Sequence, residues 1–248
     1  MDSVDTPSDK ENSNGATTNS KEVHDVIIVG AGAAGIGVAI SVAHSGVENF
    51  LIVDRKGVGS SFAAWPAETR FITPSFPSNS IGMLDLNSVA IGVSPAFNMR
   101  IEHPTGKEYA EHLQGLADFF ELPIRENTNI LGLEKTDELF HLETDEGTLF
   151  AKKVIWAAGE YQYPSQGAFL GSDLCLHTSR INSYSNLEGE DYLIIGGYES
   201  GIDAAYHLSK HGKSVRVFDQ NCPWGEESSD PSLSLSTFSF GEYMEPTK

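Results

Sequence analysis

The feature that most constrains this chain is a pattern that occurs twice: an apolar strand, a glycine-rich turn and a helix of small residues. The first turn is Gly30-Ala31-Gly32-Ala33-Ala34-Gly35, and the second is Gly196-Gly197-Tyr198-Glu199-Ser200-Gly201. One such turn is weak evidence, because glycines collect in many turns. Two turns, each between a strand and a helix, indicate a protein that holds two nucleotide cofactors and passes electrons between them.

The residues around the first turn predict a complete strand–helix–strand unit. Residues 24–29 form a mostly apolar run, typical of a strand buried in a parallel sheet. Small apolar residues over 33–43 predict a helix that ends at Gly46. Residues 50–54 then predict the second strand of the unit.

Each glycine of the first turn has a role in binding a dinucleotide. The first permits a tight turn, the second lets the backbone approach the pyrophosphate, and the third lets helix and strand pack closely. Gly30, Gly32 and Gly35 occupy these three places. The amino end of the helix then presents free N–H groups to the phosphates. Asp54 follows at the expected distance of about 20 residues, where its carboxylate would accept hydrogen bonds from an adenosine ribose.

The middle of the chain is less regular. Residues 57–105 are rich in Gly, Pro and Ser, and so long a stretch without clear periodicity usually wraps a ligand or has another function. Residues 106–122 predict a helix with one apolar face. Residues 124–151 predict short strands joined by tight turns, and residues 153–159 predict another buried strand that ends in glycine.

The second pattern predicts the same order of elements, with a strand over 192–195, a helix over 202–211 and a strand over 215–219. Its turn is imperfect, because Tyr198 stands where the second glycine belongs and its Cβ would crowd a pyrophosphate. This unit therefore binds a nucleotide in a shifted position or with weaker affinity, or it is a structural remnant that binds none.

Asp219 is the ribose acid of the second unit. An acid at this place favours a free 2′-hydroxyl, and hence NADH over NADPH. Lys213 and Arg216 are nearby cations, so we expect only a moderate preference.

Charge and cysteine content exclude several classes of function. The 248 residues include 16 Lys and Arg against 35 Asp and Glu, a formal net charge of −19 that would repel nucleic acid and anionic membranes. Cys175 and Cys222 lie far apart and form no C-x-x-C motif, which disfavours a disulfide framework, a metal site or a redox dithiol. No apolar run is long enough for a membrane helix, and the amino terminus does not resemble a secretory signal. We therefore expect a soluble, cytoplasmic protein without a bound metal.

Four segments resemble the flavoproteins with two dinucleotide-binding domains, over roughly residues 24–225. Within that class the resemblance favours the flavin-containing monooxygenase-like and bacterial FAD/NAD(P)-dependent oxidoreductases. The segments are residues 25–35 with Asp54, Gly59-Ser60-Ser61-Phe62, Trp156-Ala157-Ala158-Gly159 with Pro164, and the second glycine turn. The resemblance implies an α/β chain in which a Rossmann-like FAD-binding domain, a parallel sheet with inserted β-hairpins, precedes a partial Rossmann-like NAD(P)-binding unit.

The resemblance also divides the chain and assigns its sites. Residues 1–22 are rich in Ser, Asn, Thr, Asp and Lys with almost nothing to bury, which predicts a disordered tail. The resemblance implies an FAD-binding domain over 23–160, a connector over 161–190, and a partial NAD(P)-binding domain with an irregular tail over 191–248. It assigns cofactor contacts to Gly30, Ala31, Gly32, Ala33, Ala34, Gly35, Asp54, Arg55, Ser61, Phe62, Ala158, Gly159, Gly196, Gly197, Tyr198, Glu199, Ser200, Gly201 and Asp219. It further implies that residues 59–80, with Trp65, Arg70 and Thr73, flank the flavin ring, where plain packing is the alternative.

The chain departs from the group in three places. Ser60 and Phe62 differ from its glycine-glycine-small-aromatic segment. The monooxygenase hallmark Phe-x-Gly-x-x-x-His is matched only in part, because His177 comes two residues too late, and a connector histidine is the alternative. Members of the group finish with a Gly-Asp segment that closes over the flavin, and none follows Asp219, so the resemblance implies a truncated member.

The resemblance implies an FAD-dependent oxidoreductase that takes hydride from NADH or NADPH. Its acceptor would be a small organic substrate, with molecular oxygen if the chain is a monooxygenase, and a homodimer is an open alternative for its assembly. No residue stands out as a catalytic acid or base, because the cofactors carry the chemistry. The other functions left open are a catalytically silent nucleotide-binding module and a disulfide-reductase-like protein.

Overall fold

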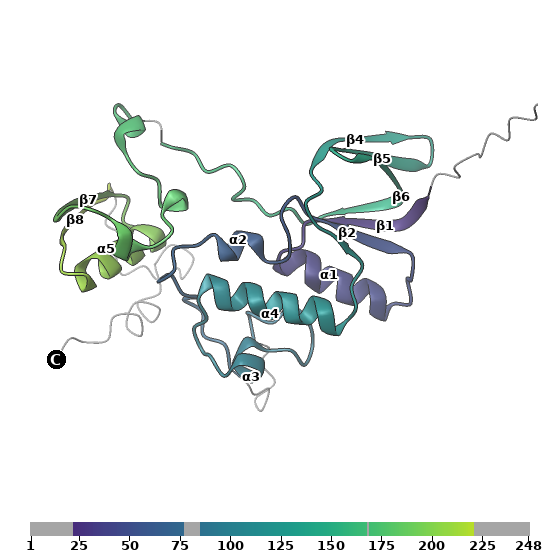
Figure 1. Cartoon of the computed structure of the whole chain (residues 1–248), viewed down its shortest axis with the longest axis horizontal. Helices are drawn as coiled ribbons and strands as arrows, with labels where there is room; N and C mark the ends of the chain where they lie inside the picture. The colour runs from purple at the N-terminus through teal and green to yellow at the C-terminus, as the bar shows by residue number, and fades with distance from the viewer. Residues whose placement is uncertain (1–21, 77–84, 168, 221–248) are drawn as a thin grey trace, which may run out of the picture.

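A computed structural model describes residues 22–76, 85–167 and 169–220 (Figure 1). The tail predicted over 1–22, apart from its last residue, and the tail after Gln220 lie outside these ranges, as does Cys222. The predicted domain division stays a prediction. One sheet lies within 23–160 and a second lies within 191–219.

The described residues form eight strands, five α-helices and three short 3-10 helices. The strands are Val23–Val29 (β1), Phe50–Val53 (β2), Ile124–Arg125 (β3), Ile130–Thr136 (β4), Leu139–Thr144 (β5), Gly147–Trp156 (β6), Asp191–Ile195 (β7) and Ser214–Phe218 (β8). The α-helices are Ala33–His44 (α1), Ser60–Ala63 (α2), Pro95–Met99 (α3), Gly106–Phe119 (α4) and Glu199–Lys210 (α5). The 3-10 helices, all between β6 and β7, are Ser172–Leu174 (η1), Thr178–Arg180 (η2) and Tyr184–Asn186 (η3).

The larger sheet has the order β3-β2-β1-β6-β5-β4. Its first four strands run parallel, with β1 between β2 and β6, and β4, β5 and β6 form an antiparallel meander. This is a mixed α/β architecture with a largely parallel central sheet, as the prediction of a Rossmann-like domain requires. The carboxyl ends of β1, β2 and β6 therefore meet at one edge, directly beside the first glycine turn.

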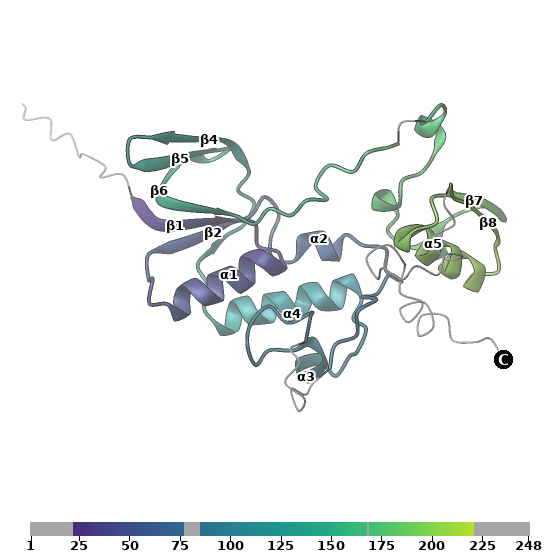
Figure 2. The same cartoon turned by 180° about the vertical axis from the view of Figure 1, so that it is seen from behind.

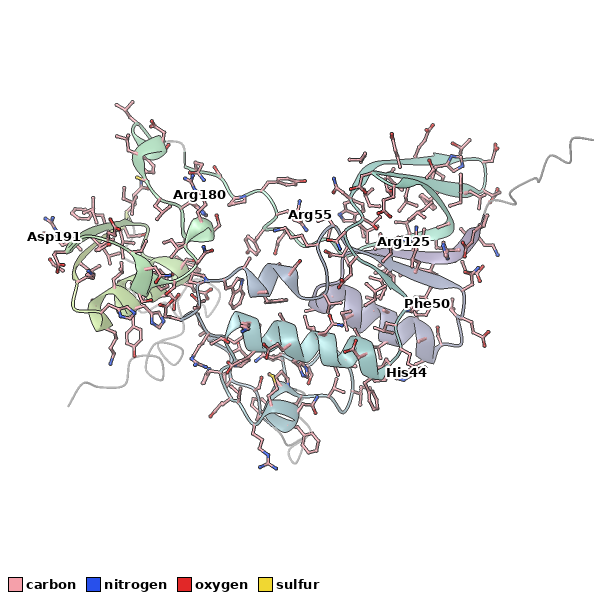
Figure 3. All side chains as sticks on the ribbon, in the orientation of Figure 1. His44, Phe50, Arg55, Arg125, Arg180 and Asp191 are labelled. Carbon is pink, nitrogen blue, oxygen red and sulfur yellow. The ribbon has the colours of Figure 1, made fainter. Side chains whose placement is uncertain are left out.

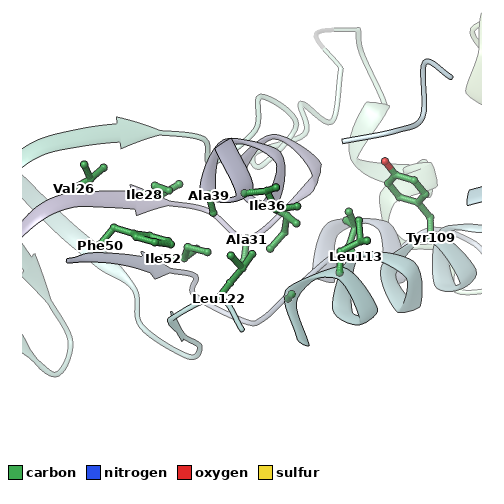
Figure 4. Close-up of a cluster of buried hydrophobic side chains, with 13 residues drawn as sticks. Val26, Ile28, Ala31, Ile36, Ala39, Phe50, Ile52, Tyr109, Leu113 and Leu122 are labelled. Atoms are coloured by element: carbon green, nitrogen blue, oxygen red, sulfur yellow. The ribbon is translucent and has the colours of Figure 1, made fainter. Parts of the chain in front are cut away.

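Both faces of the central strands are covered, which explains why β1 and β2 are almost continuously apolar. On one face, side chains of β1 and β2 pack with α1 and α4, as Figure 4 shows for Ile28, Ile52, Ile36 and Leu113. On the other face, alternate side chains of the same strands pack against the meander, where Leu142 is fully buried. Helix α4 begins with a capping box in which Thr105 and Glu108 satisfy each other's backbone amides, which stabilises its first turn.

The smaller sheet contains only β7 and β8, which run parallel. One face packs against α5 and against Ile181 and Tyr184 of the connector. The opposite face exposes Leu193, Ile195 and Phe218, each more than half accessible to solvent. Figures 1 and 2 show this unit standing apart from the larger sheet, with the connector and the segment after α2 running toward it.

The strand predicted over 153–159 is wrong in two respects. It is the second half of one ten-residue strand, β6, that ends at Trp156, and Trp156 is 59% exposed. The reason is that β5 pairs only with residues 147–151 of β6, so beyond Ala151 none of the described strands pairs with the outer edge of β6. An apolar run indicates a strand, but it does not say which neighbours cover that strand.

The remaining elements match the predictions with small shifts of their ends. The irregular stretch 57–105 contains the two short helices α2 and α3. Helix α4 ends three residues before Leu122, and helix α5 begins three residues before Ile202. Within the described ranges, no helix is both long and apolar enough to cross a lipid bilayer.

Candidate cofactor-binding site

The first glycine turn is held closed by two contacts that only glycine permits. Gly30 has φ +107°, and a Cβ there would lie 2.4 Å from the carbonyl oxygen of Ala157 at the end of β6. A Cβ on Gly35 would lie 1.8 Å from the carbonyl oxygen of Gly30. The turn therefore packs between α1 and the edge of the sheet, and both residues are glycines for steric reasons.

Gly32 differs from these two glycines, because a Cβ at this position would meet no atom within 4 Å. Gly32 is the N-cap of α1, and the first turn of the helix carries no acidic residue. The open side of Gly32 therefore adjoins a helix amino terminus with unsatisfied N–H groups and a positive dipole end. This is the cradle that a pyrophosphate needs, and a side chain would fill it.

Asp54, at the end of β2, is tied to the turn by hydrogen bonds. Its Oδ2 accepts from the backbone amide of Ala31 at 2.9 Å. Its Oδ1 accepts from the amides of Lys56 at 2.8 Å and Gly57 at 2.9 Å. A carboxylate has about four acceptor sites, so these bonds leave about one on Oδ2 for a ribose hydroxyl. The residue thus fixes the loop as well as offering an acceptor, a function that spacing alone did not reveal.

The segment that begins at Gly59 lies directly against the turn. The amide of Gly59 donates to the carbonyl oxygen of Ala31 at 3.0 Å, which brings α2 beside the cradle. Ser61 is exposed, whereas the Phe62 ring packs edge-on against Tyr109 at 4.9 Å between centroids. Phe62 is therefore anchored in the protein, and contact between either side chain and a cofactor stays a prediction.

The carboxyl end of β6 also lies beside the first glycine turn. The amide of Ala157 donates to the carbonyl oxygen of Val29 at 2.8 Å, so Ala158 and Gly159 leave the sheet next to the turn. Arg55, labelled in Figure 3, follows Asp54 after β2. Its guanidinium lies 5.9 Å from the ring centroid of Tyr163, which follows β6 in the chain. The structure therefore brings together the predicted residues of the first site.

The second glycine turn has the same backbone geometry with different chemistry. A Cβ on Gly201 would lie 1.9 Å from the carbonyl oxygen of Gly196, and Asp219 Oδ2 accepts from the amide of Gly197 at 2.7 Å. Tyr198 is the N-cap of α5 and is 58% exposed. Glu199, followed by Ser200, places an acid in the first turn of α5. We expect the Tyr198 side chain to crowd a phosphate at this helix terminus and the Glu199 carboxylate to repel it.

Several residues around the predicted flavin segment have structural partners. Arg70 lies 3.6 Å from Glu108 and donates to the carbonyl oxygen of His103 at 2.8 Å. The Trp65 ring lies 5.2 Å from that of Phe71. These contacts favour the packing alternative for both side chains.

His177 also has a local partner. Its Nδ1 accepts from the amide of Ser179 at 3.2 Å and caps η2. This contact favours a connector histidine over a hallmark residue.

Glu68 has a structural role that sequence patterns do not reveal. Burial alone would raise the pKa of this carboxyl, but hydrogen bonds from the Ser183 hydroxyl and the amides of Tyr184 and Ser185 outweigh it and lower the pKa to about 2. Glu68 lies in the irregular stretch that follows α2, where no periodicity distinguishes one acidic residue from another.

Comparison with known proteins agrees with this geometry. A family model described as pyridine nucleotide-disulphide oxidoreductase matches residues 27–245. An uncharacterised CzcO-like oxidoreductase of Geobacillus kaustophilus is 29% identical over 194 residues, which are 77% of this chain and 53% of the relative. An alkyl hydroperoxide reductase component of Staphylococcus aureus is 25% identical over 81% of this chain and 34% of its own length.

Solved structures show the same fold. The bacillithiol disulfide reductase Bdr (YpdA) of Staphylococcus aureus has a TM-score of 0.67 and 24% identity, over 88% of this chain and 63% of its own. A flavin-containing monooxygenase of Stenotrophomonas maltophilia has a TM-score of 0.64 and 18% identity, over 79% of this chain and 57% of its own. This chain thus spans about half the length of the CzcO-type relatives that it matches.

Proposed function

The chain belongs to the pyridine nucleotide-disulphide oxidoreductase family of FAD-dependent enzymes, and we propose that it binds FAD in its first βαβ unit and takes hydride from NADH or NADPH bound in its second. The observation that carries the proposal is the cradle at Gly32, which is open, lies at the amino terminus of α1 and carries no acidic side chain. These are the properties that a dinucleotide pyrophosphate requires.

In the proposed complex each residue of the first site has a separate task. The amides at the start of α1 bind the pyrophosphate, and Asp54 accepts a hydrogen bond from the adenosine ribose through the free site on Oδ2. The segment from Gly59 and the strand end at Ala158 and Gly159 line the path of the cofactor toward the substrate side. The flavin, when bound, supplies the acceptor for hydride, and the protein positions it and limits the access of water.

For the reductant we propose NADH in preference to NADPH. Asp219 at the end of β8 is suited to a free 2′-hydroxyl and would repel a 2′-phosphate. Lys213 is occupied elsewhere, since its Nζ donates to the carbonyl oxygen of Gly189 at 2.6 Å and lies 3.6 Å from Glu190. Arg216 of β8 is a cation close to Asp219 in the sequence and works against this preference, but with Lys213 held at Gly189 and Glu190 we propose that the acid outweighs it. Tyr198 and Glu199 make binding at this unit weaker than at the first.

For the electron acceptor we propose molecular oxygen together with a small organic substrate, as in a monooxygenase. A disulfide reductase that relays electrons through its own thiols needs two neighbouring cysteines. Within the described ranges, Cys175 has no second cysteine beside it. The acidic charge of the chain argues against nucleic acid and anionic membrane partners, and a homodimer is part of the same proposal.

An absorption spectrum of the purified chain, reconstituted with FAD, tests the proposal directly. We expect retained flavin absorbance that bleaches on anaerobic addition of NADH, and more slowly on addition of NADPH. A chain that takes up no FAD would be a silent module and would contradict the proposal. A chain that binds FAD but is bleached by neither nucleotide would contradict its reductase half.

A further inference from the structure

Three consecutive residues of the segment after α2 contact the connector or α5. The amide of Ala67 donates to the carbonyl oxygen of Asn182 at 2.9 Å. The carboxylate of Glu68 accepts from the hydroxyl of Ser183 at 2.6 Å and from the amides of Tyr184 at 3.0 Å and Ser185 at 3.1 Å. Glu68 therefore caps η3, more than 100 residues away in the sequence, as a side chain does at a helix amino terminus.

The third of these residues reaches α5 itself. The hydroxyl of Thr69 donates to Asp203 Oδ2 at 2.6 Å, and the hydroxyl of Tyr184 donates to the same oxygen at 3.2 Å. His207 Nε2 lies 3.3 Å from Asp203 Oδ1, and its ring stacks on Tyr184 with centroids 5.6 Å apart and planes 5° apart. We call Glu68, Thr69, Tyr184, Asp203 and His207 the joint.

The joint is partly removed from solvent, so breaking its hydrogen bonds has a large free-energy cost. The side chains of Asp203 and His207 are only 13% and 14% exposed, and that of Glu68 is 19% exposed. His211 of α5 lies 3.7 Å from Glu68 and adds a further polar contact. A buried carboxylate that loses its donors is left with its full desolvation cost, so the joint favours one arrangement of these elements.

The same segment leads back to the first glycine turn within a few residues. Gly59, at the start of α2, is bonded to Ala31 of that turn, and Phe71, just beyond Thr69, donates its amide to the carbonyl oxygen of Pro104 in the first domain at 2.9 Å. In both views of the molecule the chain after α2 runs toward α5 (Figures 1 and 2). One short segment is therefore anchored at both ends in the first domain and at its middle in the second unit.

We infer that Glu68 and Thr69 are positioning residues that hold the second βαβ unit in the orientation in which its nicotinamide meets the flavin of the first unit. This inference rests on the proposed function. Hydride transfer requires the two rings to be in contact, and a misplacement of about 1 Å in such geometry costs on the order of 100-fold in rate. Neither residue touches the cradle, so their loss changes the arrangement of the units and leaves FAD binding intact.

The sharpest test compares Thr69→Val, which replaces the hydroxyl with a methyl group, with Thr69→Ser, which keeps the hydroxyl. Glu68→Gln is the second variant, and Glu111→Gln and Thr148→Val are matched controls on exposed surface. Hydrogen exchange of the amides of residues 182–187 and of α5 is measured on the full chain without cofactor. The rate of flavin reduction at saturating NADH and the FAD dissociation constant are measured on the same proteins.

We expect amide exchange in these segments to accelerate at least about tenfold in Thr69→Val and Glu68→Gln. The rate of flavin reduction should fall about 10- to 100-fold, while the FAD dissociation constant stays within about threefold. Thr69→Ser and both controls should behave as the wild type.

Wild-type exchange and wild-type reduction in both variants would overturn the inference. So would an equal loss of rate in Thr69→Ser, because the hydroxyl would then have no role. If the wild-type chain takes up no FAD, the proposed function fails, and the exchange measurement still decides whether the joint holds the second unit.

Discussion

The two βαβ units share their backbone and differ in their surroundings. Gly32 and Tyr198 cap their helices with φ and ψ of −81° and −168° against −86° and −170°. In each unit an aspartate accepts a hydrogen bond from the turn. Yet β1 and β2 are buried between helices and a meander, whereas the outer face of β7 and β8 is exposed. Local sequence thus determines the turn, and the neighbours determine how tightly it is held.

The first glycine of each turn illustrates the difference. Gly30 and Gly196 have nearly the same φ, +107° and +102°. A Cβ on Gly30 would collide with the end of β6, whereas a Cβ on Gly196 would meet nothing within 4 Å. The reason is that β1 has a neighbour on each side and β7 pairs only with β8 among the described strands. Gly30 is constrained by conformation and by packing, and Gly196 by conformation alone.

The largest expected contrast concerns the cores. Ile52 of β2 is fully buried, and Ile195 of β7 is 53% exposed. Ile52→Ala should lower the free energy of unfolding by about 4 kcal/mol, and Ile195→Ala by less than about 1 kcal/mol. Urea unfolding followed by circular dichroism measures both. Equal losses would mean that the outer face of β7 is covered in solution and would break the comparison.

A smaller contrast is expected between the two glycines. Gly30→Ala combines backbone strain with a collision and should cost about 3 kcal/mol of unfolding free energy. Gly196→Ala has the strain alone and should cost about 1–2 kcal/mol. The same urea titration measures the pair. A loss for Gly196→Ala as large as that for Gly30→Ala would show that a neighbour absent from the described structure packs against β7.

A further contrast is between the N-cap residues of the two helices, Gly32 in α1 and Tyr198 in α5. Tyr198→Gly would give the second unit an open turn like the one at Gly32 in the first unit. This change should tighten NADH binding about tenfold, or about 1.4 kcal/mol. Tyr198→Phe keeps the ring and should leave affinity unchanged, since the bulk of the side chain is the obstacle. Calorimetric titration with NADH measures both variants. Unchanged or weaker binding in Tyr198→Gly would mean that the tyrosine contributes contacts to the nucleotide.

The smallest expected effect is on the stability of the folded chain at acidic pH. The pKa of Glu68 is lowered from 4.5 to about 2, so ionised Glu68 stabilises the folded chain. This contribution is complete above about pH 4.5 and is lost as the pH falls toward 2. We expect it to amount to about 1 kcal/mol after allowance for solvent screening. Unfolding midpoints between these pH values should depend less steeply on pH in Glu68→Gln than in Glu111→Gln, and equal slopes would remove this role of Glu68.

Most of the architecture followed from short-range patterns in the sequence. The glycine turns, the apolar strands beside them and the acids Asp54 and Asp219 identified both units, because each signal lies within a few dozen residues. The exposure of Trp156 could not be predicted, since it depends on where β5 stops pairing with β6. Nor could the role of Glu68, whose partners lie more than 100 residues away.

The sequence likewise predicted some features of the candidate site and not others. The residues with steric roles, such as Gly30 and Gly35, could be read from spacing because the turn requires them. The hydrogen bonds that Asp54 makes to the turn could not, because the same carboxylate is compatible with a loop-fixing and a ribose-binding role. Side chains such as Phe62 and Arg70 lie in the predicted segment, but their packing depends on α4, which comes later in the chain.

The most direct test of the account is the affinity of the chain for FAD before and after a single change at the cradle. A Cβ at Gly32 faces open space, so Gly32→Val should change the free energy of unfolding by no more than about 1 kcal/mol. Calorimetric titration should show one FAD bound to the wild type and at least about 100-fold weaker binding to the variant, equivalent to about 2.7 kcal/mol. Unaltered affinity in a folded Gly32→Val protein would contradict the assignment of the pyrophosphate to this turn.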